Sequence, residues 1–137
     1  MKELYSVLIV DDESILRNGL KHICDWEEEG FQLIGEAANG KEALEIIKDK
    51  EPNIVITDLI MPEIDGVELT KIIKKDYPNT KVLVLSNVSE FEYVKDTFKY
   101  GIHDYLLKTH LHLHARERLG NRIMQFARNG GTLFHMA

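Results

Sequence analysis

Apolar, strand-like runs alternate with helix-like segments along this chain, and the alternation limits the possible folds more than any other feature. Five apolar runs predict strands, at about 4–10, 31–36, 53–57, 81–86 and 102–107. Five segments have helical spacing of apolar residues, at about 14–24, 40–49, 66–76, 90–100 and 112–128. This alternation is typical of βαβ units around a parallel sheet. We therefore expect a three-layer α/β fold with a doubly wound five-stranded parallel sheet of strand order 2-1-3-4-5.

Helix signals support these assignments. Asn39 with Glu42 three residues later resembles a capping box and predicts the start of the second helix. In the first helix we expect four apolar residues to face the core: Ile15, Leu16, Leu20 and Ile23.

Polar residues end four of the apolar runs. Asp11 and Asp12 follow the first run, Asp58 follows the third, Ser86 ends the fourth and Lys108 follows the fifth. Because the carboxyl ends of parallel strands lie at one edge of a sheet, these side chains should converge there. Clustered carboxylates repel unless a cation lies among them, and Mg²⁺ prefers oxygen ligands of this kind. The pattern predicts metal-assisted phosphoryl chemistry.

Composition narrows the function further. A chain of 137 residues fits one domain, and its 44% hydrophobic content is ordinary for a soluble globular protein. No apolar run approaches the roughly 18 residues that suggest a membrane span, and the N-terminus does not resemble a signal peptide. Cys24 is the single cysteine, which favours a reducing, cytoplasmic compartment. The net charge of −6 argues against direct nucleic-acid binding.

The charge pattern changes after Lys108. Residues 109–137 contain four Arg, no Lys and one Glu, whereas the preceding residues contain a single Arg, Arg17. Four of the six His also lie in this segment. We expect one domain over 1–128 and treat 129–137 as a tail of uncertain origin. No helix-turn-helix fits after residue 108, so no DNA-binding effector domain is expected in this chain.

Five stretches resemble the receiver domain of bacterial two-component response regulators, which has a flavodoxin-like fold. They are 7–13 (VLIVDDE), 56–62 (ITDLIMP), 65–66 (DG), 85–86 (LS) and 104–108 (DYLLK). The sequence at 25–26, 35–37, 91–93 and 104–108 is similar to that of receivers that precede an AraC-type DNA-binding domain.

The resemblance implies a role for each matching residue. Asp58 would be the nucleophile that accepts a phosphoryl group from a sensor histidine kinase. Mg²⁺ would be held by Asp11, Asp12, Asp58 and the backbone carbonyl of Ile60. Ser86 and Lys108 would contact the phosphoryl oxygens, and Tyr105 would be an aromatic switch. The chain would then be no enzyme in the usual sense, although it would catalyse its own phosphotransfer and a slow autodephosphorylation.

The resemblance also implies partners. Besides the kinase, a second copy of the chain would bind through the face formed by helix 4 (the segment at about 90–100), strand 5 (about 102–107) and helix 5 (about 112–128). DNA would be reached only through an effector module that is not present here, in a transcription regulator.

Some positions depart from the receiver pattern. Thr109 stands where most receivers have a proline after a cis bond, and a cis bond before a non-proline residue costs about 3–4 kcal/mol. Asn87 replaces a smaller residue beside the phosphorylation site. Ile60 and Val88 are apolar where polar groups help to position an attacking water, which predicts slow loss of phosphate.

Three alternatives remain open at this point. A stand-alone receiver could act by protein contacts. A flavodoxin-like binder of flavin mononucleotide would share the topology, but it needs a Ser-, Thr- or Gly-rich loop where this chain has Asp11-Asp12-Glu13. An aspartate-nucleophile phosphatase would usually need a second acid at position 60, which is Ile.

Overall fold

The strands form one parallel sheet. The computed structural model describes residues 4–23, 25–86 and 104–107, and for Ser86 and 104–107 it describes the backbone alone. The strands are β1 (Tyr5–Val10), β2 (Phe31–Ala37), β3 (Ile54–Asp58), β4 (Lys81–Ser86) and β5 (Asp104–Leu107). They lie in the order β2-β1-β3-β4-β5, and every pairing is parallel. The predicted parallel α/β sheet is therefore confirmed in its first four strands, and the short β5 extends it beside β4.

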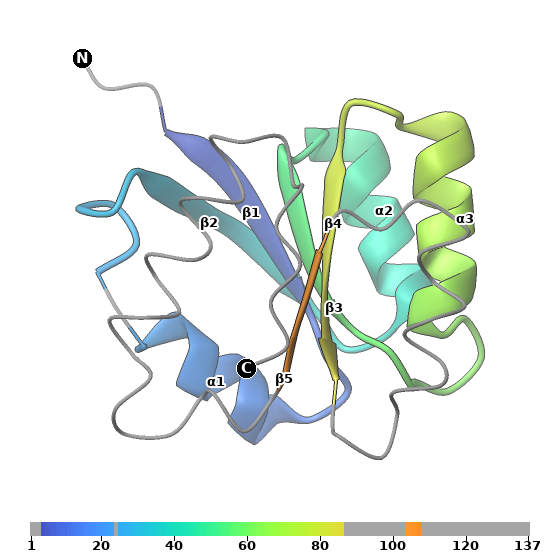
Figure 1. The fold of residues 1–137 in the computed structure, drawn as a ribbon, viewed down its shortest axis with the longest axis horizontal. Coiled ribbons are helices and arrows are strands. Elements are labelled where there is room, and N and C mark those ends of the chain that lie inside the picture. The colour runs from blue at the N-terminus through green and yellow to red at the C-terminus, as the bar shows by residue number, and fades with distance from the viewer. Residues whose placement is uncertain (1–3, 24, 87–103, 108–137) are drawn as a thin grey trace.

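The helices cover both faces of this sheet (Figure 1). They are α1 (Ser14–Lys21), α2 (Gly40–Lys50) and α3 (Gly66–Asp76). Figure 1 shows α2 and α3 side by side on one face, with α1 on the other. The described residues thus form the three layers expected from the sequence.

Alternate residues of the strands supply two separate cores, as the period of two in a strand requires. On the α1 side, Leu20, Ile23 and Trp26 pack against a cluster from the sheet: Val7, Ile9, Phe31, Ile54, Ile56, Leu83 and Leu85. On the other side, α2 and α3 cover the intervening strand residues: Leu8, Val10, Ala37, Val55, Val82 and Val84. A strand buried on both faces reads as a continuous apolar run, which is why the sequence identified the central strands clearly.

Caps fix where the two better-packed helices begin. Asn39 accepts a hydrogen bond from the backbone N–H of Glu42 at 2.9 Å, so the predicted cap of α2 is confirmed. The Glu42 carboxylate in turn accepts from the N–H of Ala38. Asp65 caps α3 in the same way, through the N–H of Glu68. Each such cap stabilises a helix by about 1 kcal/mol.

One core assignment was wrong. Ile15 is 86% exposed, whereas Leu20 and Ile23 are buried and Leu16 is partly buried. The residues that face the sheet follow the spacing i, i+4, i+7 from Leu16, and Ile15 lies one position, about 100° of helix rotation, off that stripe. The helix also ends at Lys21, earlier than the predicted residue 24.

The predicted helices at 90–100 and 112–128, and the tail at 129–137, lie outside the described residues. Within the described ranges, no helix combines the length and apolar character needed to cross a bilayer.

Candidate functional site

The carboxyl ends of β1 and β3 lie side by side at the lower edge of the sheet in Figure 1, and the sequence has an aspartate at each of them. Val10 is paired in register with Thr57, so the next residues, Asp11 and Asp58, stand opposite each other on neighbouring strands. Both are almost completely buried, Asp11 at 1% and Asp58 at 3% exposure. Adjacent strands are about 4.8 Å apart, so the backbones of Asp11 and Asp58 lie close together. Among the described residues, the group of carboxylates within 4.8 Å of one another consists of Asp11, Asp12 and Glu13 and does not include Asp58.

Two further carboxylates lie beside Asp11. Oxygens of Asp11, Asp12 and Glu13 all lie within 4.8 Å of one another, and the last two residues are exposed. The Asp11 Oδ1 accepts a hydrogen bond from the N–H of Glu13 at 2.9 Å, which folds the loop over this carboxylate. Glu13 was not among the predicted site residues. Its position directly after Asp11-Asp12 was the only signal in the sequence.

The loop after β3 is held tightly around Asp58. The Asp58 Oδ1 accepts a hydrogen bond from the N–H of Leu59 at 2.8 Å. Gly66, the first residue of α3, donates its N–H to the carbonyl of Leu59 at 2.7 Å. A Cβ at Gly66 would lie 2.4 Å from the Asp58 carbonyl oxygen and 2.8 Å from the Leu59 Cα, closer than real Cβ atoms come. Glycine is therefore required here because α3 begins against the backbone of the strand that ends in Asp58.

Ile60 lies within this loop and is 50% exposed. The loop also contains Glu63, whose φ of 65° is in the left-handed region that non-glycine residues seldom adopt. The exposed, apolar side chain at position 60 leaves the backbone carbonyl as the oxygen that this residue could offer to a metal.

The remaining predicted residues are placed only by the backbone. Ser86 ends β4, one residue beyond Leu85, which is paired with Asp58. Tyr105 is paired with Val84 in β5. Lys108 directly follows β5 in the sequence and, with the Lys108–Thr109 bond, lies outside the described residues. The carboxyl ends of β1, β3, β4 and β5 thus share one edge of the sheet.

A group of charged residues adjoins this edge on the side of β2. The Arg17 Nη1 donates a hydrogen bond to the carbonyl oxygen of Asp11 at 2.6 Å, and its Nε donates to the carboxylate of Glu36 at 2.8 Å. Lys21 donates to the other oxygen of Glu36 at 2.6 Å. The hydrogen bonds from Lys21 and Arg17 lower the pKa of Glu36 below its ordinary value of 4.5. Glu36 is therefore ionised at neutral pH and keeps both cations in place.

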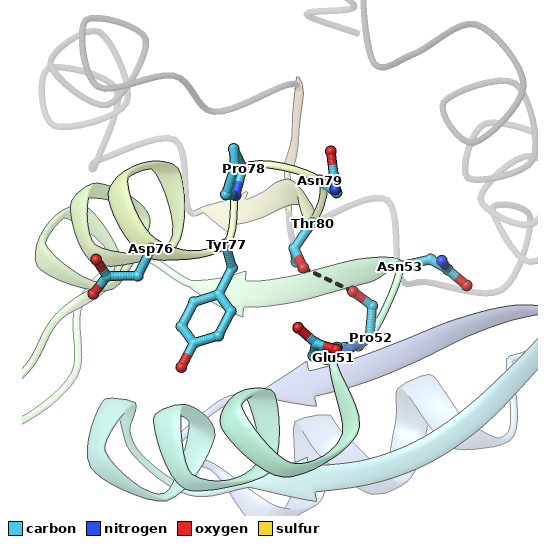
Figure 2. A pocket seen from close by; sticks show the side chains of 8 residues that line it. All are labelled: Glu51, Pro52, Asn53, Asp76, Tyr77, Pro78, Asn79 and Thr80. Atoms are coloured by element: carbon cyan, nitrogen blue, oxygen red, sulfur yellow. Dashed lines mark hydrogen bonds between the residues drawn. The ribbon is translucent and has the colours of Figure 1, made fainter.

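A separate hollow lies at the opposite edge of the sheet (Figure 2). It is lined by residues that precede β3 and β4: Glu51, Pro52, Asn53, Asp76, Tyr77, Pro78, Asn79 and Thr80. In Figure 2 the Thr80 hydroxyl donates to the Pro52 carbonyl, at 2.9 Å. This hollow lies at the amino ends of β3 and β4, away from Asp11 and Asp58.

The acidic cluster fits a hard divalent cation. Its donors are carboxylate oxygens of Asp11, Asp12 and Glu13; Asp11 is buried, and Asp12 and Glu13 reach solvent beside it. Mg²⁺ takes oxygen ligands and usually retains several waters, which a partly open site of this kind allows.

Comparison with known proteins assigns the chain to a family. The profile of the response regulator receiver domain matches residues 7–119, so the chain belongs to that family. It is a signalling domain, and receiver domains of this kind interact with histidine kinases. This membership agrees with the receiver resemblance and gives no support to the flavin-binding alternative.

Individual relatives of the chain are regulatory proteins, in agreement with this family. The chain is 49% identical over 105 residues to the "Uncharacterized transcriptional regulatory protein YesN" of Bacillus subtilis, covering 77% of this chain and 28% of that protein. Other relatives are covered over 41–55% of their length, so the chain spans about half or less of these proteins.

Solved structures show the same fold. The receiver domain of AraT, a response regulator from Geobacillus stearothermophilus, has a TM-score of 0.79 and 30% identity, over 93% of this chain and 98% of that one. A two-component transcriptional regulator AraC from Clostridium phytofermentans has a TM-score of 0.72 and 32% identity, over 90% and 98%.

Proposed function

We propose that Asp58 is the phosphoacceptor of this receiver. The observation that carries the proposal is the pairing of β1 with β3, which sets buried Asp58 opposite buried Asp11 at the carboxyl edge of the sheet. In the proposed reaction a carboxylate oxygen of Asp58 attacks the phosphorus of a phosphohistidine on a sensor kinase. The P–N bond breaks, a P–O bond forms, and the products are an acyl phosphate and a free histidine.

We further propose that Asp11, Asp12, Asp58 and the Ile60 carbonyl hold Mg²⁺. Phosphoryl transfer needs charge neutralisation more than covalent help, and the cation supplies it when bound. Glu13 lies close enough to Asp11 and Asp12 to add a water-mediated contact. The hydrogen bond from Leu59 N–H to Asp58 Oδ1 helps to orient the carboxylate that is the proposed nucleophile.

Lys108 and Ser86 are assigned to the phosphoryl oxygens and Tyr105 to a switch that follows Ser86. The support is the receiver motif at 104–108, together with the backbone placement of Ser86 and Tyr105 near the same edge. An added phosphate brings negative charge and strong acceptor oxygens, which attract a lysine and a hydroxyl.

We propose that the receiver controls a DNA-binding module of AraC type in a transcription regulator. The name of the Clostridium structure supports the AraC-type module, and the name of the Bacillus relative supports transcription regulation. Residues 1–128 would form the receiver, and a homodimer through helix 4, β5 and helix 5 would transmit the signal. A cytoplasmic location follows from the kinase partner.

The test is incubation with acetyl phosphate, with and without Mg²⁺, followed by intact-protein mass spectrometry. We expect a gain of one phosphoryl group only with Mg²⁺, and none in Asp58→Asn. Asp49→Asn, an exposed acid on α2, is the matched control and should be phosphorylated like the wild type. A phosphorylated Asp58→Asn protein would exclude Asp58 as the acceptor.

Loss of the phosphate should be slow, because Ile60 is apolar and half-exposed beside the proposed acceptor. A half-life of about a minute or less for the phosphorylated chain would contradict this expectation.

A further inference from the structure

Arg17 contacts the backbone of the acidic loop rather than its carboxylates. Its Nη1 donates to the carbonyl oxygen of Asp11 at 2.6 Å, and its side chain is only 15% exposed. The N–H of the same residue, Asp11, donates to the carbonyl of Ala37 at 3.0 Å. Both backbone polar groups of Asp11 are therefore held, one by the end of β2 and the other by α1.

Arg17 is itself oriented by neighbouring charges. Its Nε is 2.8 Å from Glu36, and the second oxygen of Glu36 is 2.6 Å from Lys21. Its backbone N–H also donates to the carbonyl of Glu13 at 3.1 Å. A guanidinium presents several donors in a fixed plane, so engaging Glu36 with Nε limits the direction in which Nη1 can point.

We propose that Arg17 is a positioning residue for the Mg²⁺ site: it fixes the plane of the Asp11–Asp12 peptide and thereby places the Asp12 carboxylate beside Asp11. The carbonyl of Asp11 and the N–H of Asp12 belong to one rigid planar unit, so holding the first sets the direction in which the second residue leaves. Asp12 is exposed and needs such support. This inference rests on the proposed function, because it concerns the same metal site.

General electrostatics predicts the opposite effect of removing this arginine. A cation close to a Mg²⁺ site repels the metal, so its removal alone should tighten Mg²⁺ binding. A positioning role predicts weaker binding. The sign of the change therefore separates the two explanations.

The experiment is calorimetric titration of the full 137-residue chain with Mg²⁺, using Arg17→Met and the matched control Lys21→Met. Both variants remove one cation from Glu36, but only Arg17 contacts the Asp11 carbonyl. We expect Arg17→Met to raise the Mg²⁺ Kd by about tenfold, the scale seen when a group that orients a metal ligand is removed. Lys21→Met should leave the Kd within about twofold of the wild type.

Phosphorylation kinetics supply a second readout. For Arg17→Met, the half-saturating Mg²⁺ concentration in the acetyl phosphate reaction should rise, while the rate at saturating Mg²⁺ stays within about twofold of the wild type. Unfolding in urea checks that each variant is folded. If Arg17→Met does not fold, Arg17→Lys decides. The lysine variant should have a Mg²⁺ Kd about threefold above that of the wild type, because one ammonium group cannot reproduce the two fixed donor directions of the guanidinium.

Several results would overturn the inference: an unchanged or lower Kd in Arg17→Met, equal weakening in Lys21→Met, or wild-type affinity in Arg17→Lys where that variant decides. If the wild-type chain itself binds no Mg²⁺, the proposed function fails, and the inference fails with it. If wild-type binding is normal and only the Arg17 predictions fail, the proposed function stands alone.

Discussion

Gly66 links the helix α3 to the strand end that carries Asp58. Its N–H bonds to Leu59, and its carbonyl accepts the Thr70 hydroxyl at 2.6 Å. The backbone at the start of α3 therefore packs directly against the end of the strand that carries Asp58. Gly66 therefore affects the geometry of Asp58, although glycine has no side chain.

Replacing Gly66 by Ala should destabilise the protein by about 2 kcal/mol, because the new Cβ must displace the backbone of Asp58 and Leu59. Phosphorylation should slow as well. Gly19→Ala is the control, since a Cβ there meets nothing within 4 Å and helix propensity favours alanine. Urea unfolding measures both variants, and a Gly66→Ala protein as stable as Gly19→Ala would contradict the account.

Glu36 contributes to the way the free energy of unfolding depends on pH in the acidic range. Because its pKa is lowered in the folded protein, its ion pairs stabilise the fold fully above the ordinary value of 4.5. This stabilisation is lost as the pH falls through the lowered pKa. The pairs are partly exposed and screened by solvent, so the contribution is less than about 1 kcal/mol.

Glu36→Gln should therefore lower the free energy of unfolding at neutral pH, and its stability should converge with that of the wild type as the pH falls through the lowered pKa of Glu36. Glu45→Gln, the same substitution at an exposed position of α2, is the control. Parallel profiles for wild type and Glu36→Gln, from urea unfolding at a series of pH values, would show that the pairs do not contribute.

At the scale of the element, α2 has a well-formed start and a strained end. Asn39 caps its N-terminus, but its C-cap is Glu51 in the left-handed conformation, with φ 44° and ψ 65°. That conformation costs a side chain about 1–2 kcal/mol, and glycine avoids the cost. The N–H of Glu51 still closes the helix by bonding to Ile47 at 2.9 Å.

Glu51→Gly should raise the free energy of unfolding by about 0.5–1 kcal/mol. Glu45→Gly makes the same change within α2 and should lower it by about 1 kcal/mol, because glycine disfavours a helix interior. Chemical denaturation compares the two. A loss of stability in both variants would show that the Glu51 backbone is not strained.

The sequence predicted the helices and strands of the described residues, and the aspartates at the strand ends, because each depends on short-range pattern. Doubly buried strands read as apolar runs, and Asp11 and Asp58 stand where two of those runs end. The exposure of Ile15 was missed because an apolar residue beside a helical stripe looks like a member of it. The contact of Arg17 with Glu36 joins residues 19 positions apart, and no local sequence pattern predicts such a pair.

At the scale of the whole molecule, the two ends of the parallel strands form two edges of the sheet that differ in what they contain. One edge gathers the strand ends and the acidic cluster, whereas the other contains the hollow of Figure 2. A change of charge at the first edge can alter a neighbouring surface when that surface has two arrangements of similar energy. The proposed surface is the face of helix 4, β5 and helix 5.

Binding of beryllofluoride with Mg²⁺ should therefore convert the chain into a dimer, detected as a roughly doubled mass by light scattering. Asp58→Asn should stay monomeric under the same conditions. A wild-type chain that binds beryllofluoride and keeps its monomer mass would argue against dimerisation as the output.

The most direct test of the central claim is to locate the phosphoryl group. The chain is phosphorylated with acetyl phosphate and Mg²⁺, reduced with borohydride and cleaved into peptides, which are sequenced by mass spectrometry. Borohydride converts an aspartyl phosphate to homoserine, so we expect homoserine at position 58 and at no other aspartate. Homoserine at another position, or an unmodified Asp58 in phosphorylated protein, would contradict it.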